Sequence, residues 1–119
     1  MSDRSEVERV ISLFIEAYNS NDAGKIPLAK DVVMSGPMMP EPIQGETAVR
    51  WYLDEIVPFI ARMDQKTTII EGENAAVIVE FEGLNGVLIE GVEFFQIKDG
   101  LICSSHVFFD TRPLLKGAN

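Results

Sequence analysis

The chain has 119 residues, of which 46% are hydrophobic, and its formal net charge is −9. This length and composition predict one soluble globular domain over residues 1–119, large enough to bury a workable core. The acidic balance argues against nucleic acid and anionic membranes as partners. No apolar run reaches the roughly 18 residues that a membrane span needs. The single cysteine, Cys103, excludes an internal disulfide and a cysteine metal cage. We expect a cytoplasmic protein that uses no metal and no cofactor.

The first long helix is predicted from a capping motif and an apolar stripe. Ser5 and Glu8 match the S-x-x-E capping box, and the helix extends from Ser5 to about Asn19. Its apolar residues fall on one helical face: Val7, Val10, Ile11, Phe14, Ala17 and Tyr18. This face is expected to cover the core.

The next segments predict short elements and then a second long helix. A short helix is expected over residues 23–29 and a short strand over residues 31–35. Prolines make residues 36–42 unsuitable for a helix or a central strand. The second long helix is expected to begin near Gly45, and Pro58 either kinks it or ends it.

The second half of the chain predicts antiparallel strands. They are expected over residues 66–71, 75–83, 87–98 and 101–110. The dipeptides Asn85-Gly86 and Asp99-Gly100 are typical hairpin turns between the last three strands. In these three strands the odd-numbered residues form the more apolar face. A helical first half and a strand-rich second half indicate an α+β fold, whose odd-numbered faces form a concave surface covered by the two long helices.

One carboxylate interrupts the apolar face of the strand over residues 87–98. Glu93 shares this face with apolar residues and a glycine, namely Val87, Ile89, Gly91, Phe95 and Ile97. A buried bare charge is costly, so Glu93 must be neutralised, paired or directed into a cavity. Burial would raise its pKa and make it a hydrogen-bond donor or a general acid/base near neutral pH. The alternative is a structural acid that is hydrogen-bonded within the core.

Several segments together carry a family resemblance. They are residues 6–26 with a break at 19–22, residues 29–33, residues 37–45 and residues 107–114. In their order and spacing the chain resembles the nuclear-transport-factor-2-like superfamily, above all its SnoaL-like and ketosteroid-isomerase-like members. The resemblance implies a cone-shaped fold, in which a curved, mostly antiparallel sheet wraps around two long helices and one short helix and encloses a pocket. It also implies a homodimer that packs through the outer face of the sheet.

The resemblance assigns roles to individual positions. In the isomerases a strand acid helps to form an oxyanion hole, and Glu93 matches this acid. The partner tyrosine of the isomerases falls at Phe14 and their general base at Gly36, so the chain lacks both and steroid isomerisation itself is not expected. Limonene epoxide hydrolases place an arginine two residues before a strand acid, and that position is Gly91 here.

The candidate site combines an acid, a phenol and apolar walls. We expect Glu93 and Tyr18 to be the catalytic or hydrogen-bonding groups, although Tyr18 could instead be a core residue with its hydroxyl at the rim. Residues expected to contact a substrate are Phe14, Met34, Met38, Trp51, Tyr52, Val79, Phe81, Phe95, Ser105 and Phe109.

The only histidine, His106, is expected on the outer face of the sheet. One histidine and no clustered acids predict no metal site.

Three functions remain open from the sequence. The first is a small enzyme without a metal, isomerase/cyclase-like or hydratase-like, acting on an apolar carbonyl-bearing, steroid-like or polyketide-like molecule. The second is a non-catalytic protein that binds a small apolar ligand in the same pocket. The third is a dimeric interaction module whose pocket is filled by its own side chains. The glycine at position 36 favours the second and third functions over a steroid isomerase.

Overall fold

The computed structural model describes residues 3–117, with side chains for residues 3–114. Positions 1–2 and 118–119 of the predicted domain lie outside the described residues. The elements in chain order are α1 (Arg4–Asn19), η1 (Ala23–Lys25), β1 (Leu28–Ser35), β2 (Ile43–Gln44), α2 (Glu46–Ile56), η2 (Val57–Phe59), β3 (Ile60–Glu71), β4 (Asn74–Gly83), β5 (Leu88–Lys98), β6 (Leu101–Phe109) and α3 (Arg112–Gly117).

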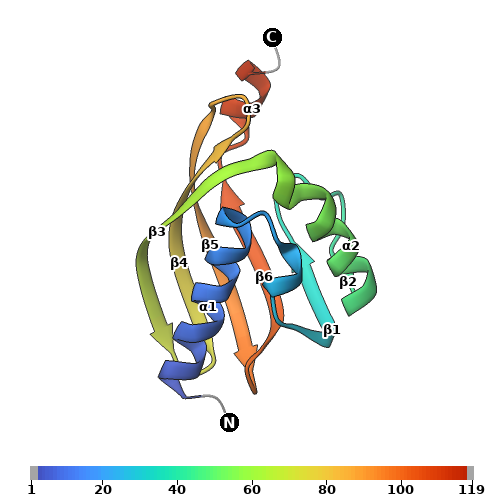
Figure 1. The fold of residues 1–119 in the computed structure, drawn as a ribbon, viewed down its shortest axis with the longest axis vertical. Coiled ribbons are helices and arrows are strands. Elements are labelled where there is room, and N and C mark those ends of the chain that lie inside the picture. Colours follow the sequence, from blue (N-terminus) through green and yellow to red (C-terminus); the bar gives the residue numbers. More distant parts are fainter. Residues whose placement is uncertain (1–2, 118–119) are drawn as a thin grey trace.

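The six strands form one curved sheet in the order β2-β1-β6-β5-β4-β3. Neighbouring strands are antiparallel, except that β1 and β6 are parallel. Figure 1 shows both long helices on the same, concave side of this sheet, with the chain ends at opposite ends of the molecule. The predicted α+β cone fold is therefore confirmed.

The first helix begins differently from the prediction. Asp3 is the N-cap, and its carboxylate accepts a hydrogen bond of 2.8 Å from the backbone N–H of Glu6. The Ser5 hydroxyl donates to the same carboxylate at 2.8 Å, so the predicted capping box of Ser5 and Glu8 is wrong. An aspartate two residues earlier takes the N-cap position and satisfies one of the free N–H groups. The apolar stripe is as predicted, and all six of its residues are buried.

The end of α1 is fastened to the sheet by one side chain. Asn19 Nδ2 donates to the carbonyl of Met63 in β3, and the N–H of Met63 donates to Asn19 Oδ1, both at 2.8 Å. The amide therefore completes the hydrogen bonds of a strand residue that has no neighbouring strand on that side. This pair of bonds fixes the last turn of α1, which carries Tyr18, relative to the sheet.

Two strands are longer than predicted and one helix is shorter. β1 begins at Leu28 rather than at residue 31, and only residues 23–25 of the expected short helix are helical, as a 3-10 turn. β3 begins at Ile60 rather than at residue 66. In the added part of β3, Arg62 on the outer face forms ion pairs with nearby acids, namely Asp64, Glu80 and Glu82. Cross-strand pairs of opposite charge stabilise such a face.

A bulge in β6 changes which of its residues face inward. Gln96 of β5 pairs with Ser104, whereas Ile97 pairs with Ile102, so the residue between them, Cys103, has no partner in β5. The extra residue reverses the alternation. Ile102 is therefore buried and Leu101 is exposed, and the prediction that all odd residues of this strand face inward holds only from Ser105 onward.

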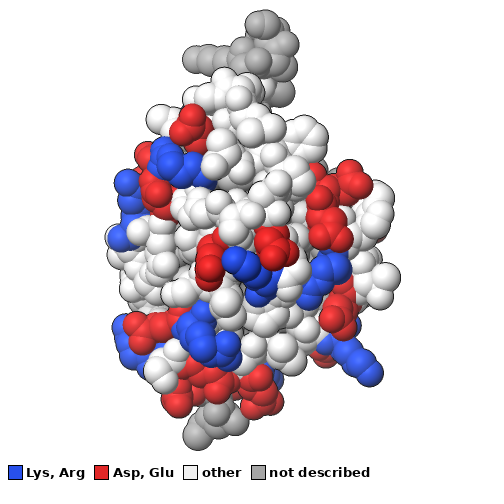
Figure 2. Space-filling view, viewed as in Figure 1, with Lys and Arg blue, Asp and Glu red and all other residues white. Residues whose placement is uncertain are grey.

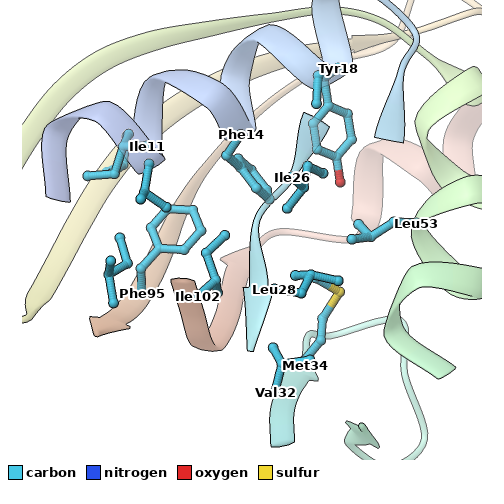
Figure 3. Packing of buried hydrophobic residues seen from close by; sticks show 14 of the residues in the cluster. Ile11, Phe14, Tyr18, Ile26, Leu28, Val32, Met34, Leu53, Phe95 and Ile102 are labelled. Carbon is cyan, nitrogen blue, oxygen red and sulfur yellow. The ribbon is translucent and has the colours of Figure 1, made fainter. Parts of the chain in front are cut away.

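The closed part of the core lies beside the first three turns of α1. Figure 3 shows Ile11 and Phe14 packing against Phe95 of β5 and Ile102 of β6. The rings of Phe14 and Phe95 meet edge-on with centroids 4.9 Å apart, which is a favourable geometry for aromatic pairs. Phe14 thus lies at the boundary between the packed core and an open space inside the cone.

Candidate functional site

A cavity of about 540 Å³ occupies the space between the two long helices and the sheet. This volume lies within the usual range for small-molecule sites. Its walls include Phe14 and Tyr18 of α1, Met34 of β1, Tyr52 and Ile56 of α2, Phe81 of β4, Glu93 of β5, and Ser105 and Phe109 of β6. We refer to this space as the central cavity.

The Glu93 carboxyl lies on the inner wall of the central cavity, and 7% of the residue is exposed. It stands between Val77 of β4 and Val107 of β6 in the register of the sheet. The Ser105 hydroxyl donates a hydrogen bond of 3.0 Å to Glu93 Oε2. The strand therefore holds one carboxyl in an apolar environment, with a single hydroxyl as its polar partner among the described residues.

Burial controls the acid strength of this carboxyl. Burial raises the pKa of Glu93 from 4.5 to about 7, and the hydrogen bond from Ser105 opposes the rise. A group with this pKa is present in both protonation states near neutral pH. It can therefore donate a hydrogen bond, accept a proton or carry a negative charge there.

Two phenols approach Glu93 from the two helices. Burial, and then the charge of Glu93, raise the pKa of Tyr18 well above its ordinary value, and the same causes raise the pKa of Tyr52. Figure 3 shows the Tyr18 ring projecting from α1 beside Phe14, with its hydroxyl turned away from the helix. Both phenols consequently remain uncharged and can act as hydrogen-bond donors.

Close packing accounts for the glycines at positions 36 and 91. A Cβ atom on Gly91 would lie 2.8 Å from the carbonyl oxygen of Phe108, so no side chain fits there without a backbone shift. A Cβ atom on Gly36 would lie 2.7 Å from a methyl group of Val107. A side chain at position 91 would therefore require the backbone of β6 to shift, and one at position 36 would require the Val107 side chain to move.

The structure places nine of the predicted site residues on the walls of the central cavity. They are Phe14, Tyr18, Met34, Met38, Tyr52, Phe81, Glu93, Ser105 and Phe109. Phe81 and Phe109 also contact each other edge-on, with ring centroids 5.5 Å apart. Whether any of them contacts a ligand remains a prediction.

The other three predicted residues lie elsewhere. Trp51 is 67% exposed and lines a separate surface groove, because it is one helical step away from Tyr52 and points outward. Phe95 is buried under Phe14 in the closed core. Val79 faces inward and is buried, but it is not part of the cavity wall. The inner face of the sheet is thus longer than the cavity that it borders.

The sequence interpretation missed much of the cavity mouth. Phe59 and Leu84 line the cavity and are also strongly exposed, as is the predicted residue Met38, so these three form the rim. They come from η2, the β4–β5 turn and the loop after β1, which meet only in the folded chain. Figure 2 shows that charged side chains are sparse at the upper centre of the molecule and frequent along its lower half and flanks. The sequence signal that could have identified the rim was an apolar residue in an otherwise polar turn, such as Leu84.

His106 does not line the central cavity, although its hydrogen-bond partner Ser35 does. His106 is exposed, forms a hydrogen bond of 2.5 Å between its Nδ1 and Ser35 Oγ, and stacks on Phe108 with ring centroids 4.2 Å apart. Within residues 3–117, no group of three or more histidine, cysteine or acidic side chains could hold a metal ion. The same residues contain no helix that is long and apolar enough to cross a membrane.

A curved sheet with two helices on its concave side and a cavity between them defines a nuclear-transport-factor-2-like protein. The sequence matches the SnoaL-like domain family over residues 11–105. The chain therefore belongs to the SnoaL-like family. A search of curated proteins finds no match.

Solved structures that are similar to this chain include proteins named for different activities and one of unknown function. A protein from Bacillus subtilis proposed to be an isomerase is 14% identical, with coverage of 99% of this chain and 96% of that chain and a TM-score of 0.84. An LEH-like epoxide hydrolase from M. tuberculosis is 18% identical, with coverages of 95% and 89% and a TM-score of 0.78. An NTF2-like protein of unknown function from Cytophaga hutchinsonii is 22% identical, with coverages of 92% and 94% and a TM-score of 0.77. At these identities the likeness shows the fold alone.

Proposed function

We propose that the protein binds a small apolar molecule with a carbonyl group in the central cavity, and that Glu93 is the acid that recognises the carbonyl oxygen. The observation that supports this most strongly is the single carboxyl in an apolar cavity, with its pKa near 7. Because Oε2 accepts the hydrogen bond from Ser105, the acidic proton is favoured on Oε1, which the described residues leave without a hydrogen bond. A ligand oxygen at that position would complete the site.

The proposed chemistry is general acid/base catalysis without a metal. A protonated Glu93 would donate to the carbonyl oxygen and stabilise the negative charge that develops on it, as preorganised donors do in other enzymes. Tyr18 and Tyr52 would supply further neutral donors from α1 and α2. Isomerisation, cyclisation and hydration of a carbonyl compound can each proceed through such an oxyanion or its enol. The names of the epoxide hydrolase and the proposed isomerase with this fold are compatible with such reactions.

The second candidate function is non-catalytic binding of the same ligand class. It is favoured by one observation, the glycine at position 36, which packs against Val107 and supplies no base where the steroid isomerases have one. In this case Glu93 would orient the ligand without moving a proton. The volume of the central cavity supports either ligand-binding function over a self-filled interaction module.

The proposed assembly is a homodimer formed through the outer face of the sheet. Phe94 and Phe108 are 44% and 57% exposed on neighbouring strands of that face. Apolar surface of this kind is usually covered by a partner, and a twofold interface would use the same patch twice.

A cytoplasmic location stays a prediction from the sequence.

Ligand binding can be tested with β-acetylnaphthalene, an apolar aromatic ketone, by calorimetry and thermal shift at pH 6. We expect saturable binding to the wild type and about tenfold weaker binding to Glu93→Leu, since leucine removes the hydrogen-bond donor. Glu90→Leu, on the opposite face of β5, is the matched control and should bind like the wild type. Equal affinity of the wild type and Glu93→Leu would contradict the proposed role of Glu93.

A further inference from the structure

The ionised form of Glu93 has no positive partner in the central cavity. Among the described residues that line the cavity, none is lysine, arginine or histidine. Once Glu93 loses its proton, the cavity therefore holds an isolated carboxylate in surroundings of low polarity. A neutral ligand leaves this charge uncompensated, whereas a positively charged ligand would neutralise it.

The last turns of both long helices border the central cavity. Tyr18 lies in the last turn of α1 and Ile56 is the last residue of α2, and both line the cavity. The carboxyl end of a helix carries a partial negative charge and favours a nearby cation. Neither helix has a basic residue in its last turn to compensate this charge. The backbone therefore adds to the negative potential of Glu93.

The cavity walls are also suited to a cation with an apolar body. Six aromatic rings line the cavity, those of Phe14, Tyr18, Tyr52, Phe59, Phe81 and Phe109. The faces of such rings attract an ammonium group within about 6 Å of the ring centre. The methionines Met34 and Met63 offer an adaptable apolar surface for the rest of the molecule. The net charge of −9 attracts a cation from a distance and repels an anion.

We infer that the central cavity also binds an apolar amine, whose ammonium group pairs with the ionised Glu93 carboxylate, and that it excludes carboxylates of the same shape. This ligand class goes beyond the carbonyl compounds of the proposed function, because it uses the opposite protonation state of Glu93. The ammonium group donates to Oε1, and the body of the amine contacts the aromatic walls.

The same geometry makes the choice between the two ligand classes depend on pH. The titratable groups that face Glu93 are Tyr18 from α1 and Tyr52 from α2, and both stay neutral because their pKa values are raised. The neighbours on β4 and β6, Val77, Ser105 and Val107, do not titrate over the pH range used below. A change of protonation state at Glu93 therefore decides which ligand binds. Its neutral form binds a carbonyl ligand, and its ionised form binds an amine.

Three compounds with one aromatic skeleton test the inference: β-acetylnaphthalene, the primary amine obtained by replacing its carbonyl group with an amino group, and β-naphthoic acid. Dissociation constants are measured by calorimetry at pH 6 and pH 8, where the amine stays protonated. Because the pKa of Glu93 is about 7, we expect the amine to bind about tenfold more tightly at pH 8 than at pH 6. The ketone should show the reverse dependence, and the acid should bind at least about tenfold more weakly than the amine at pH 8.

Two variants separate the carboxylate from the rest of the cavity. Glu93→Gln keeps the shape and a hydrogen-bond donor but cannot ionise, so it should lose about tenfold in affinity for the amine at pH 8 and keep the ketone. Glu90→Gln removes an equal charge from the outer face of the same strand and should leave both affinities unchanged. Amine affinity that is the same at both pH values, or unchanged in Glu93→Gln, would overturn the inference. If the ketone binds and the amine does not, the proposed function stands alone; if only the amine binds, the proposed function fails and the inference stands.

Discussion

The stability of the protein should fall with rising pH because of one side chain. The pKa of Glu93 is about 7 in the folded chain, compared with an ordinary value of 4.5. Between these two values the unfolded chain releases the proton while the folded chain still holds it. The folded state then binds more protons than the unfolded state, so the free energy of unfolding decreases as pH increases. Below pH 4.5 and above pH 7 the contribution of Glu93 is constant.

The size of this effect follows from the difference between the two pKa values. One pKa unit corresponds to about 1.4 kcal/mol, so Glu93 should lower the free energy of unfolding by about 3 kcal/mol between pH 4 and pH 8. This is a large part of the 5–15 kcal/mol by which most domains are stable. Glu93→Gln cannot ionise and lacks this contribution, although its amide must replace the carboxyl as acceptor for Ser105.

Urea denaturation of the wild type and Glu93→Gln at several pH values measures the effect. Other titrating groups contribute equally to both proteins, so the difference between the two free energies isolates Glu93. We expect this difference to change by about 3 kcal/mol in favour of Glu93→Gln as pH rises from 4 to 8. Glu90→Gln, on the exposed face of β5, is the matched control and should follow the wild type. A difference that does not vary with pH would refute the reasoning about burial.

Three further predictions concern the surroundings of this acid. Ser105→Ala removes the hydrogen bond that lowers the pKa of Glu93, so the pH-dependent loss of stability should extend to higher pH in the same denaturation assay. Gly91→Ala should destabilise the fold by about 1–3 kcal/mol, measured by urea denaturation, because its Cβ would lie 2.8 Å from the carbonyl oxygen of Phe108; unchanged stability would show that β6 can move away. Phe108→Glu should convert the proposed dimer into a monomer in sedimentation velocity without changing the far-ultraviolet circular dichroism, and a wild type that is already monomeric would contradict the proposed interface.

The inward direction of Glu93 could be predicted because β5 is regular. Side chains alternate strictly along Leu88–Lys98, and every odd-numbered residue from Ile89 to Ile97 is buried. The strand is central in the sheet, between β4 and β6, so its register with both neighbours leaves little freedom. The alternation of side chains along this strand was therefore enough to identify both the core face and the acid that interrupts it.

Predictions from alternating side chains were wrong where a strand departs from ideal geometry. The bulge at Cys103 reverses the faces of β6, and no residue type in that segment marks a bulge. The predicted strand began only at residue 66, whereas Arg62 in the earlier part of β3 forms ion pairs with Glu80 and Glu82 that exist only after β3 and β4 pair. Tertiary contacts of this kind cannot be read from local sequence.

The extent of the cavity could not be predicted because it depends on which side chains fill the cone. Phe95 and Glu93 lie on the same face of one strand, two residues apart, yet Phe95 is closed off by Phe14 and Glu93 faces open space. The rim is formed by side chains from distant loops, including Phe59 and Leu84. Their proximity follows from the curvature of the sheet, which the sequence pattern does not specify.

The titration of Glu93 tests the central claim most directly. The side-chain carboxyl carbons are labelled with carbon-13, the Glu93 resonance is assigned by its absence in Glu93→Gln, and its chemical shift is followed by NMR from pH 4 to pH 9. A buried carboxyl on the wall of an apolar cavity should titrate with a midpoint of about 7. A midpoint near 4.5, the ordinary value, would mean that water solvates this carboxylate freely and would contradict the account of the site.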